Sequence, residues 1–305
     1  MKKILLISLF LLSSLAIAAE PIHLSFNPPK GAKYEQRMEA TQSIHAGESG
    51  PMETKMDVTF LMEILEKTTE EVHMRLSYKG MAYTVSTGMG KMKFSSGTQE
   101  KKKGKAEDSI ETEIEKKFRK IFNMLIGKPF TIVVAPDGSV KSIAGLDVIR
   151  KSMAQAIADE GSMAQQIGAS IEEWFSDASM KDLFEQSLKI YPNKAVRTGE
   201  SWNVEFSRVA GGMNLLAKTT YTLKEVKQNI AVVAFESDIG ISLSAAIEGK
   251  LTGKQTGTLS LNPQTGMLLT SNASQSAEGS LKAQGVDLPM KLSTQAKVSS
   301  KEVKK

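Results

Sequence analysis

A sustained two-residue alternation in the last third of the chain constrains its fold more than any other sequence feature. From Ile239 to Leu261 the odd positions are mainly aliphatic residues and glycine, while the even positions are mainly Ser, Glu, Lys and Thr. Successive side chains of a β-strand point to opposite faces of a sheet, so this period predicts long strands with one apolar face. Gly249, Gly253 and Gly257 interrupt the pattern, which predicts that the strands bend or turn there.

Shorter alternating segments predict further strands in the first third of the chain. Residues 56–64 and 72–78 each alternate between apolar and polar side chains. The polar stretch 66–71 lies between them, and this arrangement is typical of a β-hairpin. We therefore expect two strand-rich blocks, over residues 20–96 and 199–296.

Between the two blocks, residues 107–190 have a mainly helical pattern. Apolar residues recur at helical spacing up to Leu125, and Gly127 and Pro129 then end that helix. The segment 130–143 instead predicts a short hairpin around a Pro-Asp-Gly turn. Further helices are expected over three segments: 146–157, 163–175 and 180–188.

These elements predict an α+β fold, in which a long-stranded, curved antiparallel sheet (half-barrel-like) carries the central helical insert packed on it. A short motif that occurs at the start of both strand blocks indicates two related halves. Gly31 and Tyr34 begin the first strand block with the same Gly-x-x-aromatic spacing that Gly199 and Trp202 give the second. Motifs this short also recur by chance, so duplication and coincidence both explain the repeated motif.

The N-terminus has the features of an export signal. Residues 1–19 contain two lysines, an apolar run and small residues that fit cleavage near Ala19 or Glu20. The run is short for a membrane span, so we expect cleavage, a periplasmic or secreted protein, and no transmembrane anchor afterwards. The chain has no Cys, which excludes disulfides and a lipid-modified Cys terminus. We expect a single domain over 20–296 and a basic tail over 297–305.

The net charge of +5 comes from the two ends of the chain. Two lysines belong to the predicted signal peptide and four to the predicted tail, while 33 basic residues balance 33 acidic ones between Glu20 and Ala296. The basic run 101–105 is followed at once by acidic residues, which is typical of a solvated loop before a helix. Nucleic-acid-binding proteins carry a basic face with a supporting motif, so nucleic acid is not an expected partner.

The segment from Tyr191 to Trp202 contains the pattern P-x-x-x-V-x-x-G-E-x-W. With the preceding helices, the following strands and the Asn-Pro-Gln-Thr-Gly turn at 262–266, it resembles a functionally uncharacterised family of exported bacterial proteins, known only as a domain of unknown function. The resemblance brings no catalytic or binding residues. In layout the chain is also similar to the periplasmic lipoprotein carriers, whose curved sheet wraps an apolar cavity closed by helices, although fold does not fix function.

The sequence offers no recognisable catalytic arrangement. A serine hydrolase needs a nucleophile on a sharp turn and a histidine base, but no G-x-S-x-G occurs. The three histidines, His23, His45 and His73, all lie in the first 73 residues. Adjacent carboxylates such as Glu70 and Glu71 point apart on a strand, which makes them a poor acid–base pair. We therefore expect a protein that is not an enzyme and needs no cofactor.

Methionine is abundant, with 16 residues. Thioethers can bind Cu(I), but flexible thioethers also fill cores and adaptable apolar pockets, and Met residues in the first block occupy the apolar phase of predicted strands. We therefore expect core or pocket rather than a metal site. The candidate inward-facing, pocket-lining positions are Met56, Phe60, Met62, Met74, Phe235 and Ile241.

The favoured interpretation is a non-enzymatic envelope protein that binds a hydrophobic ligand or lipid in a cavity between sheet and helices. One alternative is a structural or assembly protein of the envelope that contacts partner proteins through exposed strand edges. Another is a hydrolase whose site the sequence hides. The expected partners are accordingly a lipid, another apolar molecule, or an envelope protein.

Overall fold

The structure is a computed structural model that describes residues 20–47, 50–88, 90–96, 113–157, 172–173, 175–210, 213–244, 248–283 and 286–304. Its main feature is one antiparallel sheet of twelve strands in the order β6-β5-β3-β2-β1-β12-β11-β10-β9-β8-β7, with β4 paired to β3. The strands span Lys33–Ala46 (β1), Met52–Lys67 (β2), Val72–Thr87 (β3), Gly90–Ser95 (β4), Pro129–Val134 (β5), Val140–Ala144 (β6), Ser201–Ala210 (β7), Met213–Lys227 (β8), Ile230–Ser244 (β9), Glu248–Leu261 (β10), Leu268–Ala283 (β11) and Val286–Glu302 (β12).

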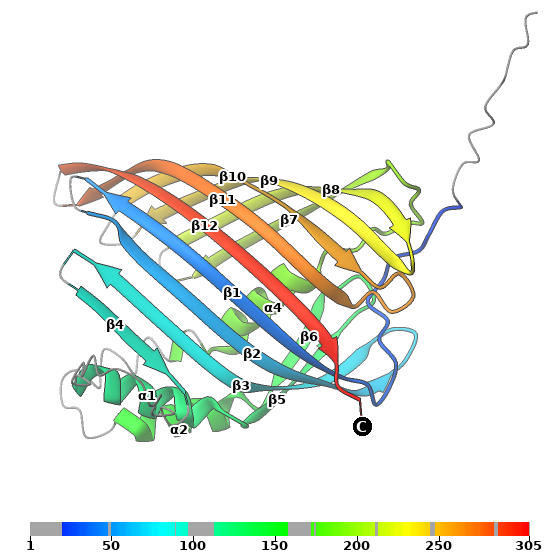
Figure 1. The fold of residues 1–305 in the computed structure, drawn as a ribbon, viewed down its shortest axis with the longest axis horizontal. Helices are drawn as coiled ribbons and strands as arrows, with labels where there is room; N and C mark the ends of the chain where they lie inside the picture. The colour runs from blue at the N-terminus through cyan, green and yellow to red at the C-terminus, as the bar shows by residue number, and fades with distance from the viewer. Residues whose placement is uncertain are drawn as a thin grey trace, which may run out of the picture.

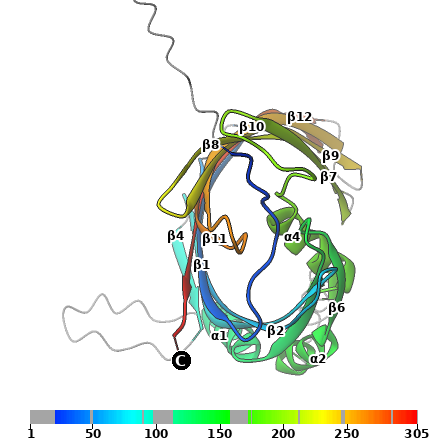
Figure 2. The same cartoon turned by 90° about the vertical axis from the view of Figure 1, so that its right-hand side faces the viewer.

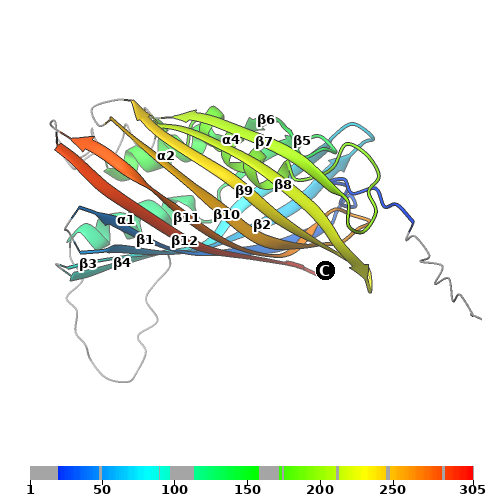
Figure 3. The same cartoon turned by 90° about the horizontal axis from the view of Figure 1, so that it is seen from above.

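The first and last strands pair at the middle of this sheet. β1 runs antiparallel to β12, with Ala40 opposite Ala296. The strands of the first block lie on one side of this pair and those of the second block on the other (Figure 1). The strands run obliquely along the molecule (Figure 3), and the sheet curves round on itself (Figure 2). The predicted curved antiparallel sheet is confirmed, as an open sheet whose edge strands are β6 and β7.

The two-residue alternation places different chemistry on the two faces of the sheet. Val233 and Leu259 are buried on the inner, concave face, whereas Glu236 and Lys254 on the same two strands are exposed on the outer, convex face. The predicted N-terminal hairpin is also present, because β2 pairs with β3 and places Met62 opposite Leu76.

The described helices are α1 (Glu113–Leu125), α2 (Leu146–Ile157) and α4 (Asp177–Leu188), so the predicted helical insert is present in part. The predicted helix over 163–175 falls almost entirely outside the described residues. α1 packs against α2 and β4, whereas α4 contacts both β6 and β7. Since β6 and β7 are the two edges of the sheet, α4 bridges the opening between them (Figure 2).

The predicted basic tail differs from the structure. β12 continues to Glu302, pairs there with Tyr34 of β1, and pairs through Ser299 with Thr270 of β11. Lys297 and Lys301 are exposed on the convex face of this strand, as the charges of a half-buried strand should be. The inward residues at this end are Val298, Ser300 and Glu302, so the apolar phase of the alternation is weak and the lysines dominate the sequence.

The glycines of β10 also differ from the prediction. Gly249, Gly253 and Gly257 lie inside one continuous strand, and the connection from β9 comes at residues 245–247, outside the described residues. A Cβ atom on Gly253 would lie 2.6 Å from the Cα atom of Ala277 on β11. These glycines therefore allow a close approach of neighbouring strands in a strongly curved sheet rather than a reversal of the chain.

The hydrophobic core lies at one end of the concave face, which we call the closed end. The N-terminal segment crosses this end (Figure 2). Its Leu24 and Phe26 side chains are fully buried in the core. The Phe26 N–H donates a 2.8 Å hydrogen bond to the Pro136 carbonyl, and the Asn27 N–H donates one of 2.8 Å to the Thr265 carbonyl. The segment thus joins the β5–β6 turn to the β10–β11 turn.

Candidate ligand-binding site

A cavity of about 230 Å³ lies between α4 and the concave face of β7–β12. The sheet contributes apolar side chains such as Val204, Phe206 and Phe235, and the helical side contributes polar side chains including Glu185 and Lys189. Glu185 and Lys189 form an ion pair of 3.5 Å. The cavity is therefore apolar towards the sheet and polar at the helix.

A row of small residues explains why the sheet leaves space here. Gly257, Ala273, Ala296 and Ala40 lie directly opposite one another on β10, β11, β12 and β1. Phe235 on β9 extends this row at one end and Met56 on β2 at the other. Ala273 and Ala296 line the cavity, and larger side chains at these two positions would occupy the space beneath α4. The ring of Phe235 lies over Gly257, where a Cβ atom would be 2.5 Å from the Phe235 Cζ atom.

The next row, on the side away from the closed end, is polar but uncharged, and we call it the polar band. Thr219 on β8 hydrogen-bonds Ser237 on β9 at 2.7 Å, and Gln42 on β1 donates to Thr294 on β12 at 3.3 Å. Thr219, Ser237 and Gln255 also line the cavity. In register order the band consists of Thr219, Ser237, Gln255, Gln275, Thr294, Gln42 and Thr54.

Beyond the polar band the concave face becomes apolar again. Ile239, Leu251 and Ala277 are buried but are not members of the main core cluster. In the register rows that run from Val233 to Ile241 on β9, every described inward-facing residue of β8–β12, β1 and β2 is uncharged. The concave face is therefore a neutral wall with one polar band between two apolar regions.

A charged contact lies at the edge of this wall. Arg208 faces inward from β7, and its Nε atom lies 3.8 Å from Oδ2 of Asp182 on α4. The Nε atom is buried, and no described residue accepts a hydrogen bond from it. This ion pair is one of the contacts that hold α4 across the opening between the sheet edges.

The six predicted pocket positions lie in three different environments. Met62 and Met74 are 4% and 0% exposed in the closed core. Met56 and Phe60 are half-buried against that core, and the Phe60 ring lies 4.8 Å from the ring of Tyr78. Phe235 alone among the six lines the cavity, and Ile241 is half-buried on the apolar wall beyond the polar band.

Sequence reasoning missed the polar band. Its signal was present in one place, because Gln255 occupies the apolar phase of the alternating segment 239–261. A polar residue in that phase predicts a polar group on the inner face. The other members come from distant parts of the chain, and the sheet register alone brings them into one row.

Burial raises the pKa of tyrosines in this region. The ring of Tyr221 lines the cavity and stacks on Trp202, with ring centroids 5.6 Å apart. Burial raises the pKa of its phenol to about 12. Burial likewise raises the pKa of Tyr191 above its ordinary value. Both phenols are therefore neutral at any physiological pH.

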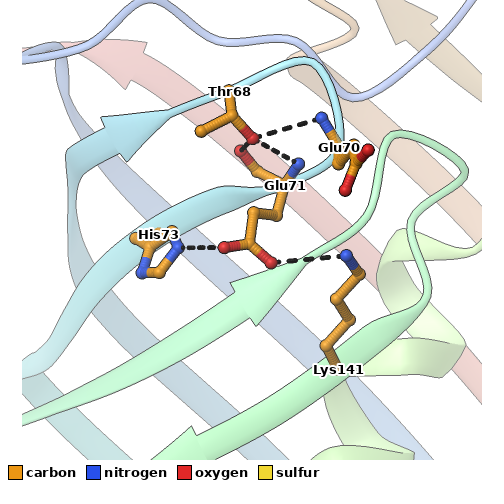
Figure 4. Close-up of polar contacts among 5 residues, drawn as sticks. All are labelled: Thr68, Glu70, Glu71, His73 and Lys141. Atoms are coloured by element: carbon orange, nitrogen blue, oxygen red, sulfur yellow. Dashed lines mark hydrogen bonds and ion pairs between the residues drawn. The ribbon is translucent and has the colours of Figure 1, made fainter.

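A separate polar cluster lies at the tip of the β2–β3 hairpin (Figure 4). The Glu71 carboxylate accepts a 2.7 Å hydrogen bond from Nε2 of His73 and lies 3.3 Å from Nζ of Lys141 on β6. These contacts, with that of His73 first, lower the pKa of Glu71. The Thr68 hydroxyl accepts hydrogen bonds from the backbone N–H groups of Glu70 and Glu71, at 3.2 and 3.1 Å. The cluster therefore joins the hairpin to β6.

Within the described part of the chain, no cluster of three or more His, Asp or Glu side chains could hold a metal ion. The described helices are also too short or too polar to cross a membrane.

The comparisons with known proteins place the chain in a family. A family of unknown function (DUF6263) matches residues 69–268. The chain belongs to this family. The DUF6263 match runs from the β2–β3 turn to the first residue of β11 and includes the segment 191–202. The expectation of an uncharacterised family is confirmed, whereas β1 and β12, which join the two blocks of the sheet, lie outside the match.

Solved structures are similar to this DUF6263 chain only in outline. A lipovitellin structure, described for its lipid–protein interactions, has 9% sequence identity and a TM-score of 0.47 over 90% of this chain. The chain spans about a quarter of that lipovitellin chain, since 25% of it is covered. An outer membrane channel from Pseudomonas putida F1 has 8% identity and a TM-score of 0.24, with 90% of this chain and 96% of the channel covered. No curated protein matches the sequence.

Proposed function

We propose that this chain is a non-enzymatic binding protein that holds one apolar, lipid-like molecule between α4 and the concave face of its sheet. The observation that carries the proposal is the cavity between α4 and the small residues Ala273 and Ala296 of the sheet. Burial of apolar surface is the main source of affinity for such ligands, and the sheet side of the cavity offers apolar side chains such as Val204, Phe206 and Phe235.

The size of the cavity indicates how the ligand would lie. Pockets for drug-sized molecules usually have volumes of about 300–1,000 Å³. The cavity of about 230 Å³ therefore suits part of an apolar chain, such as one acyl chain. The rest of the molecule would extend along the apolar wall beyond the polar band, towards Ile239 and Leu251.

The two faces of the sheet favour an internal ligand over an external one. The convex face carries ion pairs such as Arg37 with Asp57 and Lys254 with Glu236. Charged side chains of this kind keep a surface hydrated, whereas the described inward-facing residues of β8–β12, β1 and β2 in the rows from Val233 to Ile241 are uncharged. An apolar molecule is therefore accommodated inside the curve of the sheet.

We also propose that the protein works outside the cytoplasm after cleavage of residues 1–19. In support, cleavage there would leave intact the described N-terminal segment, in which Ile22 forms a bridge with Val196. N-terminal sequencing of protein from fractionated cells of its source should give a start near Ala19 or Glu20. An uncleaved protein in the cytoplasm would contradict this part of the proposal.

The ligand proposal is tested with a variant that fills the cavity with a larger side chain from the sheet. Purified protein is extracted with organic solvent, refolded and titrated with phenylnaphthylamine, an uncharged apolar dye. Ala273→Leu places a larger side chain into the cavity and should weaken dye binding by at least about tenfold, while the free energy of unfolding changes by less than about 1.5 kcal/mol. Ser274→Leu, on the exposed face of the same strand, is the matched control and should leave dye binding unchanged.

Two results would count against the proposal. Wild-type protein that takes up no dye has no accessible apolar site. Equal dye affinity in wild type and Ala273→Leu would mean that the dye binds elsewhere.

A further inference from the structure

We propose that the polar band binds a neutral ester or amide group of the ligand, with apolar chain lying on both sides of it. The inference deepens the proposed function and rests on it, because it assigns the class of ligand held on the concave face. The band crosses the concave face on seven strands in unbroken register, from Thr219 on β8 to Thr54 on β2.

The hydrogen-bonding groups of the band are only partly used within the protein. The described residues supply hydrogen bonds between Thr219 and Ser237 and between Gln42 and Thr294. Gln255 and Gln275 lie directly opposite each other, and the described residues offer no hydrogen-bond partner to either side-chain amide. Each amide has two N–H donors and a carbonyl acceptor, so the pair can serve a ligand group that both donates and accepts, or one that only accepts.

The position of the two amides directs them to a ligand rather than to bulk solvent. Gln255 lines the cavity beneath α4, together with Thr219 and Ser237. Both glutamines are half-buried, and the rows on either side of them are apolar or small. An apolar molecule over this wall would cover the amides, and a covered amide without a hydrogen-bond partner is unfavourable. A ligand with a polar group at this point satisfies them.

The electrostatics of the wall favour a neutral polar group. The described residues of the band and of the rows next to it carry no charge, and Lys189 on the helical side of the cavity is already paired with Glu185 at 3.5 Å, so a buried carboxylate or phosphate would lack a free counter-ion there. The inward-facing Arg208 is already placed against Asp182. A carbonyl of an ester or amide accepts hydrogen bonds without a charge, and it lies naturally between two apolar segments in an acylated molecule.

The test compares two probes of equal chain length, dioctanoylglycerol with ester linkages and its dioctyl ether analogue without the carbonyl groups. Wild-type protein should bind the ester about tenfold more tightly than the ether, the effect expected of one or two net hydrogen bonds. In the double variant Gln255→Leu/Gln275→Leu this ratio should fall to about one, because the amides that donate hydrogen bonds to the ester carbonyls have been removed.

The matched control makes the same Gln-to-Leu substitution on the opposite, convex face of the sheet. Gln295 lies on β12 with its side chain exposed on the convex side, and Gln295→Leu should retain the wild-type ester-to-ether ratio. Urea unfolding of all variants shows whether each is folded. If the double variant does not fold, the single variant Gln275→Leu is used, and its ratio should fall to about threefold.

The outcomes separate this inference from the proposed function. An ester-to-ether ratio that is the same in wild type and in the Gln255→Leu/Gln275→Leu variant overturns the inference, and the band then serves only as a row of cross-strand contacts within the sheet. Binding of both probes with a ratio near one in wild type also overturns it, while the proposed binding of an apolar ligand stands. Failure of wild type to bind either probe overturns both.

Discussion

The phenol of Tyr191 donates a hydrogen bond of 2.8 Å to the carbonyl oxygen of Gly266. Tyr191 follows α4, and Gly266 lies in the turn between β10 and β11, so this bond joins the helical segment to the second block of the sheet. The indole Nε1 of Trp202 donates to the carbonyl of Ile190 at 3.0 Å. The segment that predicted the family is therefore an anchor: its two end residues fix the chain after α4 at the closed end.

The hydroxyl of Tyr191 is expected to contribute to stability through this bond. Tyr191→Phe leaves the buried Gly266 carbonyl without that donor and should reduce the free energy of unfolding by about 1–2 kcal/mol. Urea denaturation at neutral pH measures this loss. Tyr83→Phe is the control, because no described residue hydrogen-bonds the Tyr83 hydroxyl, and it should change stability by less than about 0.5 kcal/mol. Equal losses in the two variants would contradict the role of the bond.

The same turn requires a glycine for two reasons. Gly266 has a φ of 67°, and a Cβ atom there would lie 2.0 Å from the carbonyl oxygen of Ser25. Gly199 has a φ of 90° but no atom within 4 Å of a built Cβ. Gly199→Ala should therefore cost only the backbone term, about 1–2 kcal/mol. Gly266→Ala should cost at least about 1 kcal/mol more, because the N-terminal segment must also move. Equal urea midpoints for Gly199→Ala and Gly266→Ala would disprove the additional steric cost at Gly266.

The sequence predicted the strands and one local hairpin, but it did not predict the long-range strand pairs. Residues 56–64 and 72–78 form a local hairpin, and its register follows from the short turn. The pairing of β1 with β12 joins Ala40 to Ala296, and no local signal encodes a contact over such a distance. Because that pair joins the two blocks into one sheet, the strand order and the bridging position of α4 could not be derived from the sequence, although the curvature of the sheet was predicted.

For the candidate site too, the sequence predicted which residues face inward but not which of them lie together. Phe235 was predicted as inward-facing from alternation alone, and it lines the cavity. Met62 and Met74 share that pattern but lie in the closed core, because the alternation reports the face and not the position along the cavity. The polar band depends on the register of seven strands, so the sequence pattern indicated only its member Gln255, a polar residue in the apolar phase of the alternation.

The C-terminal residues predicted as a tail should prove essential to the sheet. A chain that ends at Ala296 loses the part of β12 that pairs with Tyr34–Glu39 of β1 and with Thr270–Asn272 of β11. It also loses Lys301, whose Nζ lies 2.8 Å from the Glu35 carboxylate. Bonds to Lys301 and Lys79 lower the pKa of Glu35. This truncation should remove more than about 4 kcal/mol of stability or prevent folding.

The control for this truncation is a chain that ends at Val303. It retains β12 and the hydrogen bond from the Val303 N–H to the Lys33 carbonyl, at 2.8 Å. It should unfold at the same urea concentration as the full chain, as measured by far-ultraviolet circular dichroism. If the chain ending at Ala296 were as stable as this control, the central position of β12 would be wrong.

Alkaline pH should destabilise the protein through its buried tyrosines. Burial raises the pKa of Tyr221 from its ordinary 10.0 to about 12, so between these values the unfolded chain loses a proton that the folded protein keeps. The stability that this phenol contributes is complete below pH 10 and is lost as the pH rises towards 12, a loss of about 2–3 kcal/mol for this residue. Urea unfolding at a series of pH values measures the slope. Tyr221→Phe should reduce that slope by up to about 1.4 kcal/mol per pH unit, and an unchanged slope would contradict the burial of its phenol against the cavity.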